Sequence, residues 1–226
     1  MLSIVIPTLN AAKELPKTLD CLSLDGFAVE FVIADGGSSD ETPKIAAEKG
    51  AKFTATLGGR GTQLNLGAQY STGDWLLFIH ADTRPQPGWN YIVNNFIEKP
   101  ENRFHAAYFK YALNDGNPAA RRLEKIVNWR CRILGLPYGD QGLLISREFY
   151  QLLGGFLPIP LMEDIELIRR IGPKRLIQLS SSAVTSAERY RNGGYWLRPA
   201  WNLFCQGLYF VGLPPRIIAG LYNWGD

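Results

Sequence analysis

The sequence predicts an α/β fold, with a Rossmann-like, mostly parallel sheet flanked by helices on both faces. Three observations predict it. Short apolar runs alternate with helix-length segments through the first half of the chain. Most of these runs lack the polar alternation of a half-exposed strand, which indicates strands that are buried on both faces. Polar residues follow each run, at the edge where parallel sheets bind their ligands.

Four strands are expected in the first 82 residues, separated by three helices. The strands are "SIVIP" (3–7), "EFVIAD" (30–35), "AKFTAT" (51–56) and "WLLFIHAD" (75–82), and the helices span 11–24, 40–49 and 61–70. Leu15, Leu19 and Leu22 recur at helical spacing in the first helix. Asp40 stands where it can cap the second.

The fourth strand ends in His80 and Asp82, inside "LLFIHADTRP". Side chains two apart on a strand point the same way, so both would reach one site if the extended backbone persists. The alternative is that Asp82 opens a turn and His80 packs at the strand end. These ten residues alone leave both interpretations open.

Size and composition limit the functional classes. A chain of 226 residues fits one α/β domain. Its 24 basic and 21 acidic residues form no basic run, so no nucleic-acid partner is expected. Three widely separated cysteines favour a reducing compartment over a disulfide framework or a cysteine metal cluster. The sequence shows no secretory signal and no apolar run long enough to span a membrane, so a cytoplasmic location is expected.

Polar side chains after all four strands predict a ligand site at one edge of the sheet. The loop "ADGGSSDET" is rich in glycine, which lets a backbone approach a ligand closely. Asp35 at its start can accept hydrogen bonds from a base N–H or a hydroxyl. The loop does not match G-x-G-x-x-G, so a dinucleotide site has no direct support.

Taken together, six segments resemble the family 2 inverting glycosyltransferases, and in particular a small bacterial branch with unassigned substrates. In chain order they are "IVIPTLN", "VIADGGSSDET", "GGRGTQLNLGA", "GDWLLFIHADT", "LGGF" and "MEDIEL". The resemblance implies a GT-A fold, a UDP- or GDP-linked sugar donor, a divalent metal (Mg²⁺ or Mn²⁺), and a sugar, lipid or small-molecule acceptor, with a role in cell-envelope or polysaccharide synthesis. It implies one glycosyltransferase domain, with a nucleotide-sugar half at 1–85, an acceptor and catalytic half at 86–190, and a helical appendage at 191–226.

The resemblance also assigns donor-binding roles. The implied set is Pro7, Thr8, Asn10 and Glu14 beside the nucleoside, Asp35 on the base, Arg60 in the loop over the nucleotide, and His80 and Asp82 in the D-x-D element. Asp82 matches the aspartate that binds the metal. A divalent cation held there would stabilise charge on the departing diphosphate, and Arg60 could share that load. His80 departs from the usual aspartate and brings no negative charge.

The resemblance places the catalytic carboxylate in "MEDIEL". Adjacent residues on a helix point in different directions, so one of Glu163 and Asp164 is expected to face the acceptor. Asp164 is the first choice for the base and Glu163 the second. Both residues also suit the positive end of a helix without any catalytic role. Asp140 and Gln141 are expected on the acceptor side.

The C-terminal stretch "WNLFCQGLYFVGLPPRIIAGLY" leaves three interpretations open: a helix packed on the core, a homodimer interface, or contact with the inner face of a membrane. Two other functions also stay open. "LGGRGTQL" resembles the signature of sugar-phosphate nucleotidyltransferases, although it follows the third expected strand and has glutamine in place of arginine. A non-catalytic nucleotide-sugar-binding protein is the other alternative, because of His80.

Overall fold

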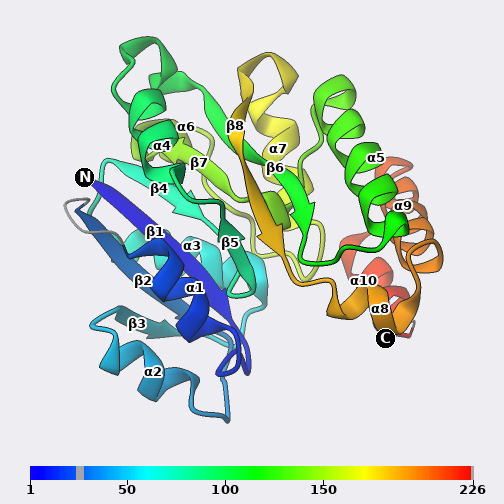
Figure 1. Cartoon of the computed structure of the whole chain (residues 1–226), viewed down its shortest axis with the longest axis horizontal. Coiled ribbons are helices and arrows are strands. Elements are labelled where there is room, and N and C mark those ends of the chain that lie inside the picture. The colour runs from blue at the N-terminus through cyan, green and yellow to red at the C-terminus, as the bar shows by residue number, and fades with distance from the viewer. Residues whose placement is uncertain (24–27, 225–226) are drawn as a thin grey trace.

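The computed structural model describes residues 1–23 and 28–224, with side chains described except at positions 189, 192, 193, 198, 223 and 224. One sheet runs through this part of the chain, in the order β3-β2-β1-β4-β7-β6-β8-β5 (Figure 1). Its strands are β1 (Leu2–Thr8), β2 (Val29–Asp35), β3 (Lys52–Ala55), β4 (Trp75–Phe78), β5 (Thr83–Pro85), β6 (Ala106–Leu113), β7 (Leu143–Ser146) and β8 (Leu176–Thr185). The first four strands are parallel where they pair, whereas β7 runs antiparallel to β4 and β6. The predicted fold class is confirmed.

Helices cover both faces because the strand residues alternate between two cores. Along β1, Ile4 and Ile6 join one buried cluster and Val5 joins the other. Helices α1 (Leu15–Leu22), α2 (Thr42–Glu48) and α4 (Trp89–Ile97) pack on the first face. Helices α3 (Arg60–Tyr70), α6 (Arg147–Leu152) and α7 (Glu163–Ile171) pack on the second. The carboxyl ends of the parallel strands are thereby left open at one edge of the sheet.

The first predicted helix begins later than expected. Residues 11–14 form a turn in which the N–H groups of Glu14 and Leu15 both donate to the carbonyl of Ala11. The helix then starts at Leu15, followed by a proline that suits a first helical turn. The expected last residue, Leu24, lies outside the described residues.

Of the two interpretations left open for this segment, extended backbone through Asp82 is wrong and a turn at Asp82 is confirmed. Strand β4 ends at Phe78, and a turn through Ala81 and Asp82 is closed by the Thr83 N–H donating to the His80 carbonyl at 3.1 Å. The hydroxyl of Thr18 donates to the Ala81 carbonyl at 2.6 Å. Helix α1 therefore fixes the position of this turn through a side chain, where a strand would be fixed by ladder hydrogen bonds. A turn, and not strand alternation, therefore positions His80 and Asp82.

The second half of the chain completes the sheet and adds helices at one end. Three short 3₁₀ turns, η1 (Pro100–Phe104), η2 (Gly139–Gln141) and η3 (Pro173–Arg175), link its elements. Helices α5 (Pro118–Leu134), α8 (Glu188–Gly193), α9 (Leu197–Phe210) and α10 (Pro215–Trp224) gather beyond β6 (Figure 1). Cys205 and Ile218 pack against Met162 and Ile165, which joins α9 and α10 to the start of α7. Among the described residues, no helix is both long and apolar enough to cross a membrane.

Candidate active site

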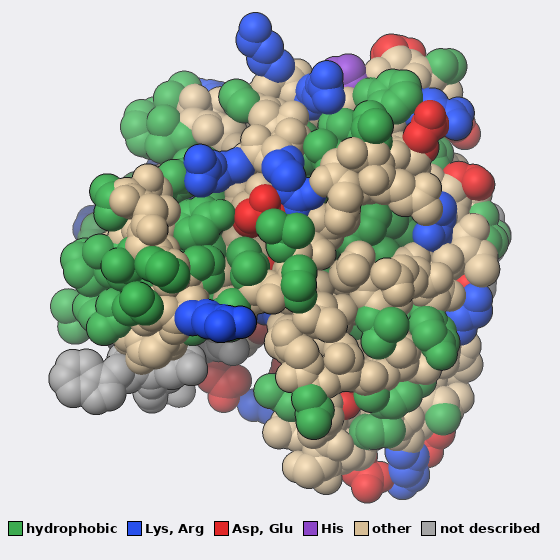
Figure 2. All heavy atoms as spheres, turned by 180° about the vertical axis from the view of Figure 1, so that it is seen from behind, with side chains coloured by type: hydrophobic (Ala, Val, Ile, Leu, Met, Phe, Trp, Pro, Cys, Tyr) green, Lys and Arg blue, Asp and Glu red, His purple; other side chains and the backbone are tan. Residues whose placement is uncertain are grey.

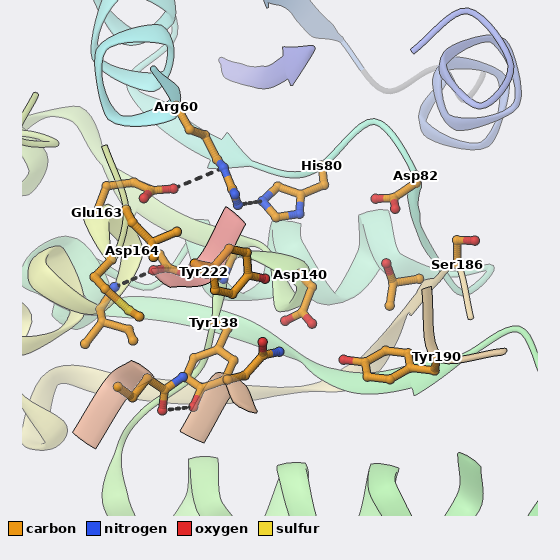
Figure 3. A pocket seen from close by; sticks show the side chains of 17 residues that line it. Arg60, His80, Asp82, Tyr138, Asp140, Glu163, Asp164, Ser186, Tyr190 and Tyr222 are labelled. Atoms are coloured by element: carbon orange, nitrogen blue, oxygen red, sulfur yellow. Dashed lines mark hydrogen bonds and ion pairs between the residues drawn. The ribbon is translucent and has the colours of Figure 1, made fainter. Parts of the chain in front are cut away.

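A pocket of about 160 Å³ lies where helices α3 and α7 begin, next to the turn that follows β4. Six residues expected at the site from the sequence line it: Arg60, His80, Asp82, Asp140, Glu163 and Asp164. They come from four separate segments of the chain. In Figure 3, Arg60 extends between Glu163 and His80, and Asp82 lies beyond His80.

Arg60 is the first residue of α3 and connects two of these segments. Its Nε lies 3.2 Å from Oε1 of Glu163, which is only 2% exposed. Its Nη1 lies 3.4 Å from Nε2 of His80. A guanidinium can only donate, so this contact is a hydrogen bond in the His80 tautomer that carries its proton on Nδ1. Gly61 permits the close approach of the segment that leads into α7, since a Cβ there would lie 2.2 Å from the Leu157 carbonyl.

Asp164 is held by backbone N–H groups on both oxygens. Gly139 donates to Oδ2 and Ile165 donates to Oδ1, each at 2.8 Å. The chain enters α7 through Met162, whose φ of 66° is a left-handed conformation that is uncommon for a residue with a side chain. This bend and the two hydrogen bonds fix the orientation of the Asp164 carboxylate at the positive end of the helix.

Two further carboxyl groups of the pocket hold their protons unusually tightly. Burial raises the pKa of Asp140 to about 7; Arg130 opposes the rise, and the charges of Asp164 and Asp82 add to it. Burial likewise raises the pKa of Glu163 to about 7, against the opposing charge of Arg60. Oδ1 of Asp140 is shielded from solvent and has no hydrogen-bond partner among the described residues. The proximity of several carboxyl groups in the pocket thus favours the protonated forms of Asp140 and Glu163.

Comparison with a protein-family model identifies the family of this chain. The model for glycosyl transferase family 2 matches residues 3–145, which include the sheet edge and four of the six pocket residues expected from the sequence. The chain belongs to glycosyl transferase family 2. The family expected from the sequence is therefore confirmed.

Curated relatives in this family match parts of the chain. A PGL/p-HBAD biosynthesis glycosyltransferase of Mycobacterium bovis is 41% identical over 90 residues, covering 36% of this chain and 35% of the relative. A 4,4'-diaponeurosporenoate glycosyltransferase of Staphylococcus haemolyticus is 38% identical over 89 residues, covering 36% and 24%. The matches thus span about a quarter to a third of these relatives' own length. An uncharacterized glycosyltransferase of Haemophilus influenzae is 26% identical over 189 residues, covering 76% of this chain and 62% of the relative.

Solved structures of GT-A glycosyltransferases share the fold. TarS of S. aureus in complex with UDP-GlcNAc aligns with a TM-score of 0.65 at 18% identity, covering 82% of this chain and 58% of TarS. The mannosyltransferase PcManGT of Pyrobaculum calidifontis, in complex with GDP-Man and Mn²⁺, gives 0.64 at 19% identity, covering 89% and 61%. Glucosyl-3-phosphoglycerate synthase of Mycobacterium tuberculosis, with Mn²⁺, UDP and glucosyl-3-phosphoglycerate, gives 0.58 at 22%, covering 82% and 70%.

Five expected donor residues of this family 2 chain lie outside the pocket, at the ends of β1 and β2. They are Pro7, Thr8, Asn10, Glu14 and Asp35. Asp35 is 2% exposed, and each of its oxygens already accepts two hydrogen bonds. Burial tends to raise the pKa of Asp35, but hydrogen bonds from Ser38, Thr8 and Gly37 outweigh it and lower that pKa.

The other residues of this group are also tied within the protein. Oδ1 of Asn10 accepts from the Ser39 N–H at 2.9 Å, and the backbone N–H of Asn10 donates to the Ser38 hydroxyl at 2.8 Å. Glu14 pairs with Arg84 at 3.0 Å. We call this strand-end group, residues 7–14 and 35–39, the β1–β2 network. Its binding role in the family stays a prediction.

Gln141 is fully buried and supports the pocket from behind instead of lining it. Its side-chain oxygen accepts from the Tyr138 N–H at 3.2 Å and from the Cys131 thiol at 3.0 Å. Its amide donates to the Phe109 carbonyl at 3.1 Å. These contacts hold the η2 turn, which carries both Asp140 and the Gly139 N–H that binds Asp164.

The C-terminal helices supply pocket residues that sequence reasoning missed. Asn202 and Gln206 come from α9 and Tyr222 from α10, and Tyr138 and Tyr190 add two more rings. The hydroxyl of Tyr138 donates to the side-chain oxygen of Gln206, while Oδ1 of Asn202 is shielded without a partner among the described residues. The aromatic segment 188–202 was the available signal, but its letters form no motif that names single residues.

Proposed function

We propose that this glycosyltransferase moves a sugar from a UDP- or GDP-linked donor to an acceptor hydroxyl with inversion of configuration. The observation that carries the proposal is the Asp164 carboxylate, oriented by two backbone N–H groups beside the only arginine among the described pocket residues. One group can take a proton from the acceptor, and the other can meet a phosphate. The known fold neighbours with UDP-GlcNAc and GDP-Man support a nucleotide-sugar donor.

In this proposal, Asp164 accepts the acceptor's hydroxyl proton as the oxygen attacks the anomeric carbon. The bond from that carbon to the acceptor oxygen forms while its bond to the diphosphate oxygen breaks, and the diphosphate leaves with the electron pair. A single displacement from the opposite face inverts the anomeric configuration. Arg60 meets the leaving diphosphate, and the buried Glu163 holds Arg60 in position through their ion pair.

A divalent cation, Mg²⁺ or Mn²⁺, fits Asp82. Its carboxylate is a hard oxygen ligand, and the Thr83 hydroxyl donates to Oδ1 over a long distance of 3.4 Å. No group of three or more histidine, cysteine, aspartate or glutamate side chains in the described part of the chain could hold a metal alone. When bound, the cation would stabilise charge on the diphosphate. Asp82 would hold it together with ligands from the donor and water, and His80 adjoins that position.

The volume of the pocket indicates which parts of the two substrates it can hold. At about 160 Å³ it is smaller than the roughly 300–1,000 Å³ of typical small-molecule sites, so it suits only the reacting ends of the two substrates. The nucleoside then lies along the β1–β2 network, in the half at 1–85. The acceptor, a sugar, lipid or small molecule, enters past Asp140 and Asn202, which line the pocket on that side.

Product analysis tests the proposal against its alternatives. The protein is incubated with UDP- and GDP-linked sugars and candidate acceptors, with and without Mn²⁺. Transfer releases the nucleoside diphosphate, a nucleotidyltransferase would release pyrophosphate, and a binding protein would release neither. Proton NMR of the product reports the anomeric configuration. Retention of configuration, or pyrophosphate as the product, would refute the proposed reaction.

A further inference from the structure

Helix α5 carries an exposed face that the proposed reaction does not use. Its buried side includes Ala120, Leu123 and Cys131. On the opposite side, Trp129 is 57% exposed and lies between a basic edge and an apolar edge. The basic edge holds Arg121, Lys125 and Arg132, and the apolar edge holds Ile126 and Ile133, which are 48% and 57% exposed.

The basic edge of α5 borders a groove of about 500 Å³. Lys110 of β6 completes a set of four cations along it, and Glu124 is the only acidic side chain among the described lining residues. Glu124 is paired with Arg121 at 2.7 Å, whereas Lys110, Lys125 and Arg132 have no ion pair within the described part of the chain. Gln178 also lines the groove, and its amide nitrogen is shielded and has no hydrogen-bond partner among the residues that the structure describes. The groove therefore offers donors and positive charge to an anionic ligand.

We propose that the α5 face and this groove dock the protein onto an anionic lipid bilayer. Phosphate headgroups would enter the groove, and Trp129, Ile126 and Ile133 would lie at the boundary between headgroups and acyl chains. An amphipathic helix with basic and apolar edges has the chemistry of such an interfacial contact. Each cation near an anionic membrane adds to the attraction. The exposed isoleucines favour a lipid surface over nucleic acid or an acidic protein, because those partners would leave apolar area in water.

The C-terminal helices, which follow a segment that packs on the buried side of α5, expose apolar side chains of their own. Tyr190 and Tyr195 pack with Leu123 and Val127 of α5, and the chain then leads into α9. Leu203 and Phe204 of α9 are each 51% exposed. In Figure 2, hydrophobic side chains gather on the side of the molecule where α9 and α10 lie. Since these helices also line the active-site pocket, docking would bring the acceptor side of that pocket toward the membrane.

Vesicle flotation of the full chain tests this docking. We expect binding to mixed phosphatidylcholine and phosphatidylglycerol vesicles, weak or no binding to phosphatidylcholine alone, and release at high ionic strength. Equal binding to both vesicle types, or to neither, would refute the proposal. Binding of a polyanion such as heparin through α5 without vesicle binding would also refute it, because it would identify a soluble partner.

Charge reversal on α5 has a matched control elsewhere on the surface. The double variant Lys125→Glu/Arg132→Glu should lower vesicle affinity by at least about 20-fold, since each cation contributes roughly fivefold at an anionic surface. The control Lys44→Glu/Lys99→Glu makes the same change in net charge at exposed sites on α2 and after α4, and should retain most of the binding. Thermal melting checks that both variants fold.

A third variant tests whether α5 or the C-terminal helices make the membrane contact. Trp129→Ser should weaken binding to the mixed vesicles and reduce its persistence in salt, because it removes the apolar anchor between the two edges. Phe204→Ser on α9 is the comparison. If Phe204→Ser abolishes binding while both α5 variants bind like the native chain, the docking surface is not α5.

Discussion

Two aspartates of this protein, Asp35, which is buried, and Asp140, which is half-buried in the pocket, have opposite environments. Asp35, in the β1–β2 network, accepts four hydrogen bonds from its own loop and from Thr8, and its pKa is lowered. Asp140, in the pocket, has a shielded oxygen without a partner among the described residues, and burial raises its pKa to about 7. Burial alone therefore does not decide what a carboxyl group does. A carboxylate whose hydrogen bonds are complete stabilises its loop, whereas one with an unpaired oxygen next to other carboxylates is ready for a ligand.

The largest effect is expected from removing the proposed catalytic base, Asp164. Asp164→Asn should lower sugar transfer by the roughly 10²- to 10⁴-fold typical of losing a general base, while donor affinity changes little. Steady-state transfer rates and calorimetric titration of the donor measure the two quantities. Glu148→Gln, at an exposed position of α6, is the control. Normal turnover by Asp164→Asn, together with an inactive Glu163→Gln, would move the base to Glu163.

The next prediction concerns the stability of the β1–β2 network. Asp35→Asn replaces one carboxylate oxygen with an amide that cannot accept from two donors, so we expect a loss of about 1–3 kcal/mol in the free energy of unfolding. Asp140→Asn should instead keep or raise stability above neutral pH, because it removes a buried charge close to Asp82 and Asp164. Urea unfolding of both variants measures the contrast. Equal losses would mean that the two carboxylates are both structural.

A smaller effect is expected at Asp82. Asp82→Asn should weaken donor binding about 10-fold or more in Mn²⁺, the size of losing a charge-assisted contact, and should change metal-free binding much less. Calorimetric titration with and without Mn²⁺ compares the two conditions. The melting temperature should stay near that of the native chain because Asp82 is part of a turn that is closed by backbone hydrogen bonds. Equal donor affinity in the native chain and the variant would remove Asp82 from the metal site.

The smallest expected effect is on the pH dependence of folding stability, to which Asp140 and Asp35 should contribute with opposite signs. The folded pKa of Asp140 is above its unfolded value of 3.8, so the folded state binds more protons between pH 4 and about 7, and stability falls as pH rises through that window. For Asp35 the folded pKa is lowered, so its contribution is present above pH 3.8 and is lost as pH falls further. The unfolding free energy of the native chain relative to that of Asp140→Asn should therefore fall as the pH is raised from 4 to 8. A flat difference would mean that Asp140 titrates normally.

The pocket shows where sequence reasoning reached and where it stopped. Arg60, His80, Asp82, Glu163 and Asp164 belong to motifs, and the fold brings all of them to one pocket. Gln141 lies in the same kind of motif but points into the core, because three interior groups use its side-chain amide. Asn202 and Tyr222 belong to no motif and were missed, since their position depends on how α9 and α10 pack on Met162 and Ile165.

The sequence by itself determined the family and the α/β class, because buried strands need continuous apolar runs and the family's loops keep their letters in order. It also determined which residue types meet at the strand ends. Only the tertiary structure decided that a turn, and not an extended strand, carries Asp82, and that Asp35 is hydrogen-bonded within its loop while Asp140 is not. The physical reason is that hydrogen-bond satisfaction and burial depend on residues distant in the chain. Local sequence patterns do not contain that information.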